Sequence, residues 1–436
     1  MSSSESTWTN WAGDQTCSPV TTVRPTSIEE VASALGLAKE RDLTVRVAGA
    51  GHSFTDTVLT DGMLLSLDRM NRILDVDRAT GLVRAQAGIT LRALSEQLDG
   101  EGLALANLGD IDVQSLAGAT ATATHGTGVR LQNLSAGIVA MELVLADGSV
   151  LEVSEHDDAD AWRAARVSIG ALGVITAITL RTVPAFTLRG VDRPRPLVDV
   201  LENLDELADS NDHFEFYNFP HSDIALTRSN NRVDGPPRPR SPAKAWIDDV
   251  LVVNHLLELV CRTGRRLPRM IPRLNRFASR LAGTSERVDR SYLIFASRRD
   301  VRFTEMEYAL PRSQAAAAVR AVRDIVHRGH LSVPLPMEVR FVASDDAWLS
   351  PAYGRETCYV AVHMFEGMEW ASYFRLVEEA MVGLAGRPHW GKRHRQDAVS
   401  LSTLYPEWNR FASVRRRLDP GGRFTNAYLK RVLGPP

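Results

Sequence analysis

Cysteine is scarce in this chain of 436 residues, which contains only Cys17, Cys261 and Cys358. The three lie far apart and form no CxxC pair, so the sequence has neither a disulfide framework nor a thiolate metal motif. Such sparse cysteine usage is typical of a reducing compartment. We therefore expect a cytoplasmic protein.

Long apolar runs are also missing. No stretch reaches the roughly 18 uninterrupted apolar residues that a membrane-spanning helix needs. The nearest candidate, 247–260, is interrupted by charged residues such as Asp248, Asp249 and Glu258. This pattern favours an amphipathic or half-buried helix over a membrane span. The first ten residues, MSSSESTWTN, lack the basic start and apolar segment of a secretory signal.

An excess of charge of one sign is absent as well, because 51 Lys and Arg oppose 53 Asp and Glu. Without a bulk positive field the chain has no surface suited to nucleic acid, and we expect no nucleic-acid partner. One local exception is the arginine-rich segment 262–280, which contains no acidic residue. Because of that segment, peripheral contact with a membrane surface remains one of the expectations.

The length favours two large domains, since one ordinary core rarely grows this far. In residues 1–185, short helices and β-rich runs alternate, a pattern that indicates an α+β domain. The sequence TSIEE (26–30) is a capping box that predicts the start of a helix. Strands at 138–145 and 150–153 flank Asp147-Gly148, which predicts a hairpin.

Residues 186–436 have a different texture and indicate a sheet covered by helices. We expect an exposed loop at 228–244, which is rich in Pro, Arg and Ser. The apolar spacing predicts strands at 214–219, 338–342 and 359–365, and helices at 246–281, 314–328 and 369–384. The pattern does not say where the last forty residues dock, and packing back on the first domain is one arrangement that it allows.

A first glycine-rich segment, Ala48 to Ser53, directly follows the strand predicted at 43–48. It begins like a dinucleotide-binding fingerprint, but His52 and Ser53 stand where the pattern continues, and no third glycine or helix follows. What remains is a tight turn in which glycines let backbone N–H groups approach an anion. The alternative is a plain turn at the end of a strand.

A second segment, 117–128, consists almost entirely of small and hydroxyl residues. Such a run allows a flat ligand to lie against the backbone, with Thr hydroxyls available to phosphate oxygens. The alternative is a core strand built from small residues. We favour the ligand, because core strands prefer Val and Ile to alternating Ala and Thr.

These two segments, with RPTSIEEV (24–31), GAGHS (49–53) and ATATHGTG (121–128), resemble the FAD-binding domain of the vanillyl-alcohol oxidase and p-cresol methylhydroxylase (PCMH) superfamily. In the second half, EMEYALP (305–311), MEVR (337–340) and HWGK (389–392) resemble the substrate domain of the aldonolactone oxidoreductases, such as L-gulonolactone oxidase and D-arabinono-1,4-lactone oxidase. The resemblance spans nearly the whole chain. The pair of GxGHS and HWGK is specific, whereas either motif alone is weak.

The resemblance implies a two-domain α+β flavoprotein, with a PCMH-type FAD-binding domain at 1–185 and a substrate-binding cap domain at 186–436. It implies oxidation of an aldono-1,4-lactone by hydride transfer from a secondary alcohol to flavin N5. The electrons would pass to a cytochrome, a quinone-linked carrier or oxygen. Alanine at 119, where glycine would admit oxygen, favours a non-oxygen acceptor. An alditol oxidase acting on open-chain polyols is the alternative that the same residues permit.

His52 is the residue on which the cofactor expectation depends. In covalent members of the superfamily, the histidine of GxGHS is bonded to the flavin 8α-methyl carbon, which requires a neutral imidazole nucleophile. The alternative is a histidine that only forms hydrogen bonds within the turn. The resemblance also suggests further cofactor-binding residues, namely Gly49, Ala50, Gly51, Ser53, Gly118, Ala119, Thr122, Thr124, His125, Gly126, Gly128, Ile175 and His389.

Glu338 and Arg340 stand two residues apart in an extended segment, so their side chains share one face. Glutamate can accept hydrogen bonds from hydroxyls, and arginine presents a planar fork to a lactone or ring oxygen. By themselves the two residues could equally form a surface ion pair. The resemblance favours catalysis and substrate binding.

Lys392 and His363 complete the predicted substrate site. In the relatives the lysine of HWGK lies beside flavin and substrate, where an ammonium stabilises the reduced anion. His363, in YVAVHMF, is either a pocket residue or a core residue. A metal pair of His389 and His394 is disfavoured by their spacing of five and by the lack of an acidic or thiol partner nearby. We expect no metal.

Overall fold

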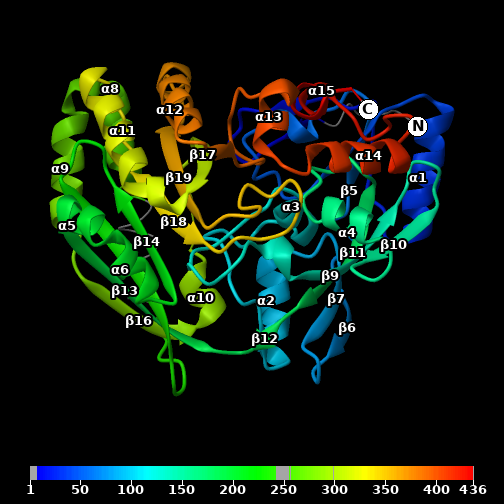
Figure 1. Cartoon of the computed structure of the whole chain (residues 1–436), viewed down its shortest axis with the longest axis horizontal. Helices are drawn as coiled ribbons and strands as arrows, with labels where there is room; N and C mark the ends of the chain where they lie inside the picture. The colour runs from blue at the N-terminus through cyan, green and yellow to red at the C-terminus, as the bar shows by residue number, and fades with distance from the viewer. Residues whose placement is uncertain (1–6, 242–254, 256, 298, 436) are drawn as a thin grey trace.

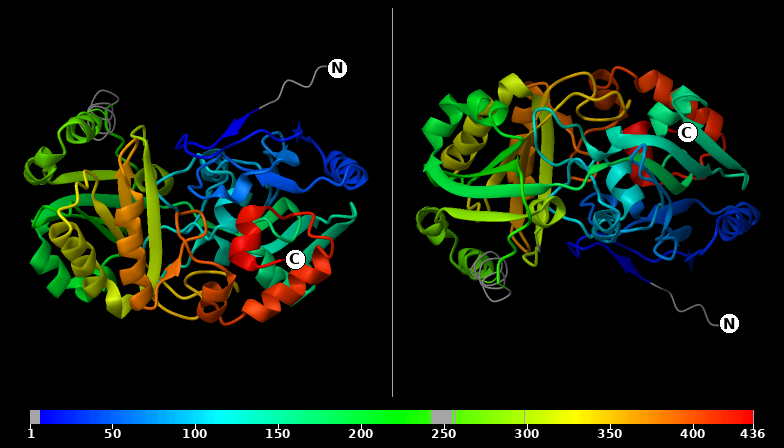
Figure 2. Two further views of the ribbon diagram at one scale, coloured as in Figure 1. Left: turned by 90° about the horizontal axis from the view of Figure 1, so that it is seen from above. Right: turned by 90° about the horizontal axis from the view of Figure 1, so that it is seen from below.

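The computed structural model describes residues 7–241, 255, 257–297 and 299–435, and it shows two lobes side by side (Figures 1 and 2). Each lobe has its own large cluster of buried apolar side chains. The two clusters lie on either side of a mostly polar zone. That zone holds the candidate site described below.

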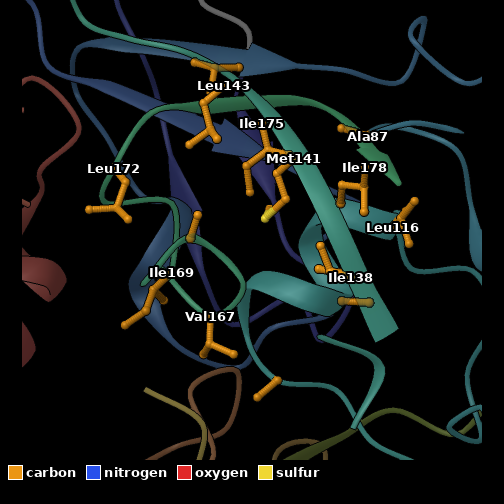
Figure 3. Close-up of a cluster of buried hydrophobic side chains, with 14 of the residues drawn as sticks. Ala87, Leu116, Ile138, Met141, Leu143, Val167, Ile169, Leu172, Ile175 and Ile178 are labelled. Atoms are coloured by element: carbon orange, nitrogen blue, oxygen red, sulfur yellow. The ribbon is translucent and has the colours of Figure 1, made fainter. Parts of the chain in front are cut away.

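The described residues of the first lobe form two main sheets and two small two-stranded sheets, β1 (Trp8–Thr9) with β2 (Thr16–Cys17) and β8 (Leu103–Ala104) with β12 (Val183–Pro184). A parallel sheet has the order β3-β5-β4, and an antiparallel sheet has the order β10-β9-β11-β7-β6. Apolar side chains of β9 and β11, such as Met141, Leu143 and Ile178, fill the core beside the antiparallel sheet (Figure 3). The strands of the two main sheets are β3 (Thr21–Val23), β4 (Val45–Ala48), β5 (Met63–Ser66), β6 (Ile73–Asp77), β7 (Leu82–Gln86), β9 (Ile138–Val144), β10 (Val150–Ser154) and β11 (Val174–Arg181).

Two local predictions for this lobe are confirmed. Helix α1 (Ile28–Glu40) begins at its cap Ser27, whose hydroxyl accepts from the Glu30 N–H at 3.3 Å. The Glu30 carboxylate accepts in return from the Thr26 N–H at 2.7 Å. Strands β9 and β10 pair antiparallel, and Gly148 takes a positive φ in the turn between them. Both features depend only on neighbouring residues, so the sequence predicts them well.

The second lobe is an eight-stranded sheet of order β16-β13-β15-β14-β18-β19-β17-β20. One face packs against α5 (Leu197–Glu202), α6 (Leu204–Asp209), α11 (Ala315–Arg328) and α12 (Ala371–Gly383). The strands are β13 (Thr187–Pro196), β14 (His213–Asn218), β15 (Ile224–Val233), β16 (Ser285–Arg290), β17 (Phe303–Pro311), β18 (Met337–Val342), β19 (Thr357–Phe365) and β20 (Arg387–Pro388). The chain is thus α+β in both lobes, as predicted.

Two expectations need correction. The loop predicted at 228–244 is wrong up to Val233, because β15 pairs with β13 over ten residues and this ladder overrides the polar composition. The single helix predicted at 246–281 is divided, in its described part, into α8 (Leu257–Arg266) and α9 (Ile271–Leu281) by a short 3₁₀ turn containing Pro268. Residues 242–254 and 256 lie outside the described residues. The alternative of a core strand at 117–128, which the sequence analysis disfavoured, is excluded because helix α3 (Leu116–Ala121) covers the first part of the segment.

The C-terminal residues return to the first lobe. Helices α13 (Ala398–Leu404), α14 (Trp408–Leu418) and α15 (Ala427–Leu433) lie beside the N-terminal elements (Figure 1). Their buried side chains, including Phe411 and Leu429, belong to the same core cluster as α1 and β9. The first lobe is therefore built from both ends of the sequence. Within the described residues, no helix has the length and apolar character needed to cross a bilayer.

Candidate active site

Two cavities meet between the lobes. The first-lobe cavity is lined only by residues of the N-terminal half, and the interlobe cavity is lined by residues of both lobes. Four residues line both cavities, namely His52, Ser53, Gln114 and Thr122. The two cavities therefore adjoin at these residues.

The two segments singled out by the sequence pack against each other in the wall of the first-lobe cavity. The turn at 49–51 follows β4, and α3 begins at its cap Ser115. A Cβ added to Gly49 would lie only 2.4 Å from the Ser115 Oγ and 3.7 Å from the Gly118 Cα. This approach of backbone to backbone leaves a cradle walled by amides and hydroxyls. Such a cradle fits a flat ligand with anionic groups.

His52 stands at the junction of the two cavities. Its ring stacks on Trp11 with centroids 5.3 Å apart. Burial and, secondarily, the charge of Lys392 lower the pKa of His52 to about 4, so the imidazole is neutral at neutral pH. Within the described part of the chain, no hydrogen bond engages either ring nitrogen.

The other predicted cofactor residues divide into two groups. Ala50, Gly51, Ser53, Gly118, Thr122 and Ile175 line the first-lobe cavity, and Thr124, His125 and His389 line the interlobe cavity. Three predicted residues line neither cavity. Ala119 is fully buried in the hydrophobic core. Gly126 packs against Asn107 and Leu108, and the Gly128 N–H donates to the Phe341 carbonyl of β18.

Alternation along the strands places polar side chains on the sheet face opposite the helices. Phe214, Met306 and Val339 point into the helix-covered core, so their neighbours point the other way. The strand pairing aligns Glu215 with Arg340, Tyr217 with Glu338, and Glu305 with His363. These side chains, together with Glu307, form one polar surface toward the first lobe. All of them except Glu215 line the interlobe cavity.

Arg340 lies at the centre of the first polar group. Its Nε donates to a Glu215 oxygen at 2.9 Å, and its Nη2 contacts the carboxylates of Asp110 and Glu338. The Tyr217 hydroxyl lies 3.2 Å from Glu338 Oε1 and 3.1 Å from Glu215 Oε1. Burial, followed by the charge of Glu215, raises the pKa of Glu338 well above its ordinary value. Burial and the neighbouring charge of Glu215 therefore favour the protonated form of Glu338.

Lys392 belongs to a second polar group. Its Nζ contacts Glu305, whose other oxygen lies 3.5 Å from the His363 Nε2. Burial disfavours the ionised form of Glu305 and by itself would raise its pKa. The neighbouring Lys392 and His363 have the larger combined effect and hold the pKa of this carboxyl below its usual range. The HWGK segment reaches this place because it runs along the edge of β17. There the His389 N–H donates to the Glu307 carbonyl and the Arg393 N–H to the Glu305 carbonyl.

His125 and His389 flank Glu307 on the same surface. The His125 ring stacks on Tyr359, and its Nε2 lies 3.3 Å from Glu307 Oε1. His389 Nδ1 accepts from the Gly391 N–H, so its proton is on Nε2, and burial lowers the pKa of His389 to about 3. These three side chains are close enough to surround a cation, but a protonated Nε2 cannot be a ligand. In the comparable cluster of Asp110, Glu215 and Glu338, the Arg340 guanidinium contacts all three carboxylates.

The structure brings together Glu338, Arg340, His363, Lys392, His389 and His52, all predicted from the sequence. His394 lies apart from His389 and forms a hydrogen bond with Tyr428. The sequence analysis missed Asp110, Tyr217, Arg299 and Glu307, which also line the interlobe cavity. The patterns Glu-x-Tyr and Glu-x-Glu, within strand segments already noted, could have indicated Tyr217 and Glu307. Asp110 and Arg299 lie in loops and gave no signal.

The chain is similar to known proteins along nearly its whole length. Residues 178–432 match the family described as D-arabinono-1,4-lactone oxidase, and residues 19–154 match the family described as FAD binding domain. An L-gulono-1,4-lactone dehydrogenase of Mycobacterium tuberculosis is 54% identical over 428 residues, covering 98% of this chain and 99% of the relative. An L-gulonolactone oxidase of Mus musculus is 36% identical, covering 97% of each chain.

Two further likenesses bear on the fold and on the alternative substrate. An alditol oxidase of a Streptomyces species is 32% identical, covering 98% of each chain. Among solved structures, a solvent-stable cholesterol oxidase matches with a TM-score of 0.84 at 19% identity, covering 97% of this chain and 96% of that one. The structural likeness supports the fold alone.

Proposed function

The chain belongs to the D-arabinono-1,4-lactone oxidase family, and from this premise we propose that it oxidises a secondary alcohol of an aldono-1,4-lactone with FAD as cofactor. The observation that carries the proposal is the interlobe cavity. Glu338, Arg340 and Lys392 line this cavity, which shares four lining residues with the glycine-walled first-lobe cavity. We assign the FAD-binding domain to residues 1–185 and the substrate-binding domain to residues 186–436, with the C-terminal helices completing the first lobe.

The first-lobe cavity fits FAD through its donor set. The amides of the turn at 49–51 and the hydroxyls of Ser115 and Thr122 suit phosphate and ribityl oxygens. Gly49 and Gly118 let the turn and α3 pack closely in the wall that carries these groups. When bound, FAD supplies a hydride acceptor for the C–H bond of the substrate alcohol. The residues that we expect to hold it are those of the sequence prediction that line the two cavities.

The residues of the interlobe cavity hold and orient the substrate in this proposal. The carboxyl of Glu338 and the hydroxyl of Tyr217 offer hydrogen bonds to substrate hydroxyls, and Arg340 fixes Glu338 in place. The Lys392 ammonium, fixed by Glu305, would stabilise the negative charge that develops on the cofactor when it is reduced. His363 donates from Nδ1 to the Pro336 carbonyl, which fixes its ring against the same cavity.

The first test is anaerobic reduction of the purified holoenzyme by L-gulono-1,4-lactone, which is measured as the loss of flavin absorbance at 450 nm. We expect Arg340→Lys to lower the rate about 10- to 100-fold, because an ammonium cannot keep the contacts to Glu215, Asp110 and Glu338 together. Arg189→Lys, in an exposed pair with Glu286, serves as the matched control and should leave the rate unchanged. A lactone series that fails to reduce the flavin would refute the proposal.

An alditol is the alternative substrate, because the chain is also 32% identical to an alditol oxidase. The same carboxyl, arginine and lysine could hold an open-chain polyol. Comparing kcat/KM for L-gulono-1,4-lactone and for the corresponding hexitol decides between them. We expect the lactone to be preferred.

For reoxidation we propose an acceptor other than oxygen, such as a cytochrome or a quinone-linked carrier. The 54% identical relative is named a dehydrogenase, which supports this choice, although the 36% identical relative is named an oxidase. Turnover should be slow in an oxygen electrode and fast with cytochrome c or a quinone analogue. Equal rates with air would favour oxidase behaviour.

We further propose that FAD is bonded to His52. The supporting observations are its place at the junction of the cavities, its neutral imidazole and its unengaged ring nitrogens. After acid precipitation the protein pellet should keep the flavin, and the intact mass should exceed that of the chain by one FAD. His52→Ala should release all flavin to the supernatant. His156→Ala, at an exposed position, should retain it.

Peripheral contact with an anionic membrane is proposed for the surface formed by α8 and α9. Here Leu267, Phe277 and Leu281 are exposed among arginines. Co-flotation with vesicles containing phosphatidylglycerol, weakened by salt, is the expected result. Phe277→Ser should reduce it, and an absence of flotation would end this part of the proposal.

A further inference from the structure

Each cation that lines the interlobe cavity already has a carboxylate partner within the described residues. Arg299 Nη2 donates to Asp110 Oδ2 at 2.8 Å. Arg340 contacts Asp110, and also Glu215 and Glu338, and Lys392 contacts Glu305. None of these three cations presents its charge to the cavity without an anion beside it.

Asp110 is the side chain that engages both arginines. It comes from a first-lobe loop, whereas Arg299 and Arg340 belong to the second lobe. Its backbone carbonyl accepts from the Ser297 N–H at 2.9 Å, which joins its loop to the loop carrying Arg299. Tyr217 adds a hydrogen bond to Asp110 Oδ2 at 3.3 Å. Backbone and side chain together thus hold this carboxylate between the two guanidinium groups.

The charges on the cavity wall bear directly on what can bind. Four acidic side chains (Asp110, Glu305, Glu307 and Glu338) and three cations (Arg299, Arg340 and Lys392) line it. A free guanidinium would bind a ligand carboxylate through two parallel hydrogen bonds. Here an incoming anion would have to displace Asp110 and lie against other carboxylates, which is unfavourable. A neutral ligand rich in hydroxyl groups meets hydrogen-bond acceptors instead.

We infer that Asp110 is a specificity-determining residue, which neutralises Arg299 and Arg340 so that the cavity accepts a neutral lactone and rejects the aldonate anion. The aldonate is the product of lactone hydrolysis, in which water opens the ring ester and a proton is released. It keeps the hydroxyls of the lactone and differs from it mainly by the open ring and one negative charge. This inference rests on the proposed lactone oxidation.

The test measures aldonate binding to the holoenzyme by isothermal titration calorimetry, with L-gulonate as the probe. We expect no measurable binding to the wild type at concentrations where L-gulono-1,4-lactone saturates the rate of flavin reduction. Asp110→Asn should leave Arg299 without its carboxylate partner and remove one of the three carboxylates at Arg340. It should therefore tighten gulonate binding about tenfold or more, with an affinity that falls as salt is added. Asp112→Asn is the matched control, because Asp112 pairs with Arg92 at 2.7 Å and does not line the cavity. It should bind gulonate no better than the wild type.

Several outcomes would overturn the inference. Wild-type enzyme that binds gulonate as tightly as lactone would refute the selection itself. A folded Asp110→Asn variant with normal FAD content and no gain in gulonate binding would refute the role of Asp110. Asp110→Ser, which is neutral and smaller, serves if the asparagine variant does not fold. Failure of the lactone to reduce the wild-type flavin would instead count against the proposed function, so the two failures are distinguishable.

Discussion

Glu215 and Glu338, on the adjacent strands β14 and β18, illustrate how burial changes the chemistry of single residues. Both carboxyls are buried, and burial raises the pKa of each. The Arg228 guanidinium moderates this effect at Glu215, whereas the negative charge of Glu215 adds to it at Glu338. The two glutamates therefore differ in proton affinity because of their surroundings and not because of their side chains, which are the same. A neutral Glu338 can donate a hydrogen bond that an ionised one could not.

A stability prediction follows for Glu338→Gln. Because the folded pKa of Glu338 is raised, the folded protein binds more protons than the unfolded chain, in which glutamate titrates near about pH 4.3. The contribution of Glu338 is complete below that pH, and it is lost as pH rises through the folded pKa. The glutamine variant does not titrate. Its melting temperature relative to the wild type should therefore increase between about pH 5 and pH 8.

Differential scanning calorimetry across this pH range is the measurement. Glu379→Gln, at an exposed residue paired with Arg375, is the control and should show no such trend. A pH-independent difference between Glu338→Gln and the wild type would contradict the raised pKa. Because glutamine can mimic a protonated carboxyl, we also expect the variant to keep more activity than Glu338→Ala.

At the scale of elements, the turn at 49–51 packs closely against α3 only because glycine has no side chain at the contact. Ser115 caps α3 by accepting from the Gly118 N–H at 3.3 Å, and the same hydroxyl lies where a Cβ on Gly49 would be. A methyl group there would push the turn away from the helix. The wall of the first-lobe cavity would then change shape.

Gly49→Ala should therefore weaken FAD retention and lower the free energy of unfolding by about 1–3 kcal/mol. Gly36→Ala is the matched control, because Gly36 lies in the middle of α1 and an added Cβ would meet nothing within 4 Å. There the change should stabilise the protein by about 0.5–1 kcal/mol through helix propensity. Flavin-to-protein ratio and chemical denaturation measure both effects. Equal behaviour of the two variants would contradict the proposed fit.

At the scale of the whole molecule, the first lobe depends on the distant C-terminal residues. The Val45 N–H donates to the Arg423 carbonyl, and the buried Arg46 guanidinium donates to the Phe424 carbonyl at 2.9 Å. The Tyr428 hydroxyl donates to the Trp390 carbonyl at 3.1 Å, which connects α15 to the HWGK segment. The tail thus contacts both strand β4, which leads into the turn at 49–51, and the segment that carries Lys392.

Leu429→Ala is expected to destabilise the first lobe by about 2–5 kcal/mol, because Leu429 is fully buried in its core. FAD should dissociate more readily from a protein that lacks the covalent bond, so the comparison is best made in the His52→Ala background. Val399→Ala, at a residue that is 78% exposed, is the control and should change stability little. Faster hydrogen exchange of the backbone amides of β4 and β5 in Leu429→Ala would report the loss of stability. Protection unchanged by Leu429→Ala would show that the tail is not integral to this lobe.

The sequence alone determined the α+β class, the helix cap at Ser27, the β9–β10 hairpin and the family, because these depend on short motifs and on side-chain periodicity. It also predicted Glu338, Arg340 and Lys392 as site residues through motifs, and all three line one cavity in the structure. Only the tertiary structure decided their partners. Asp110, Glu215 and Glu305 lie far from them along the chain and become neighbours through strand order and the packing of the lobes. The pKa values and the charge balance of the cavity depend on those long-range contacts, which local sequence patterns do not encode.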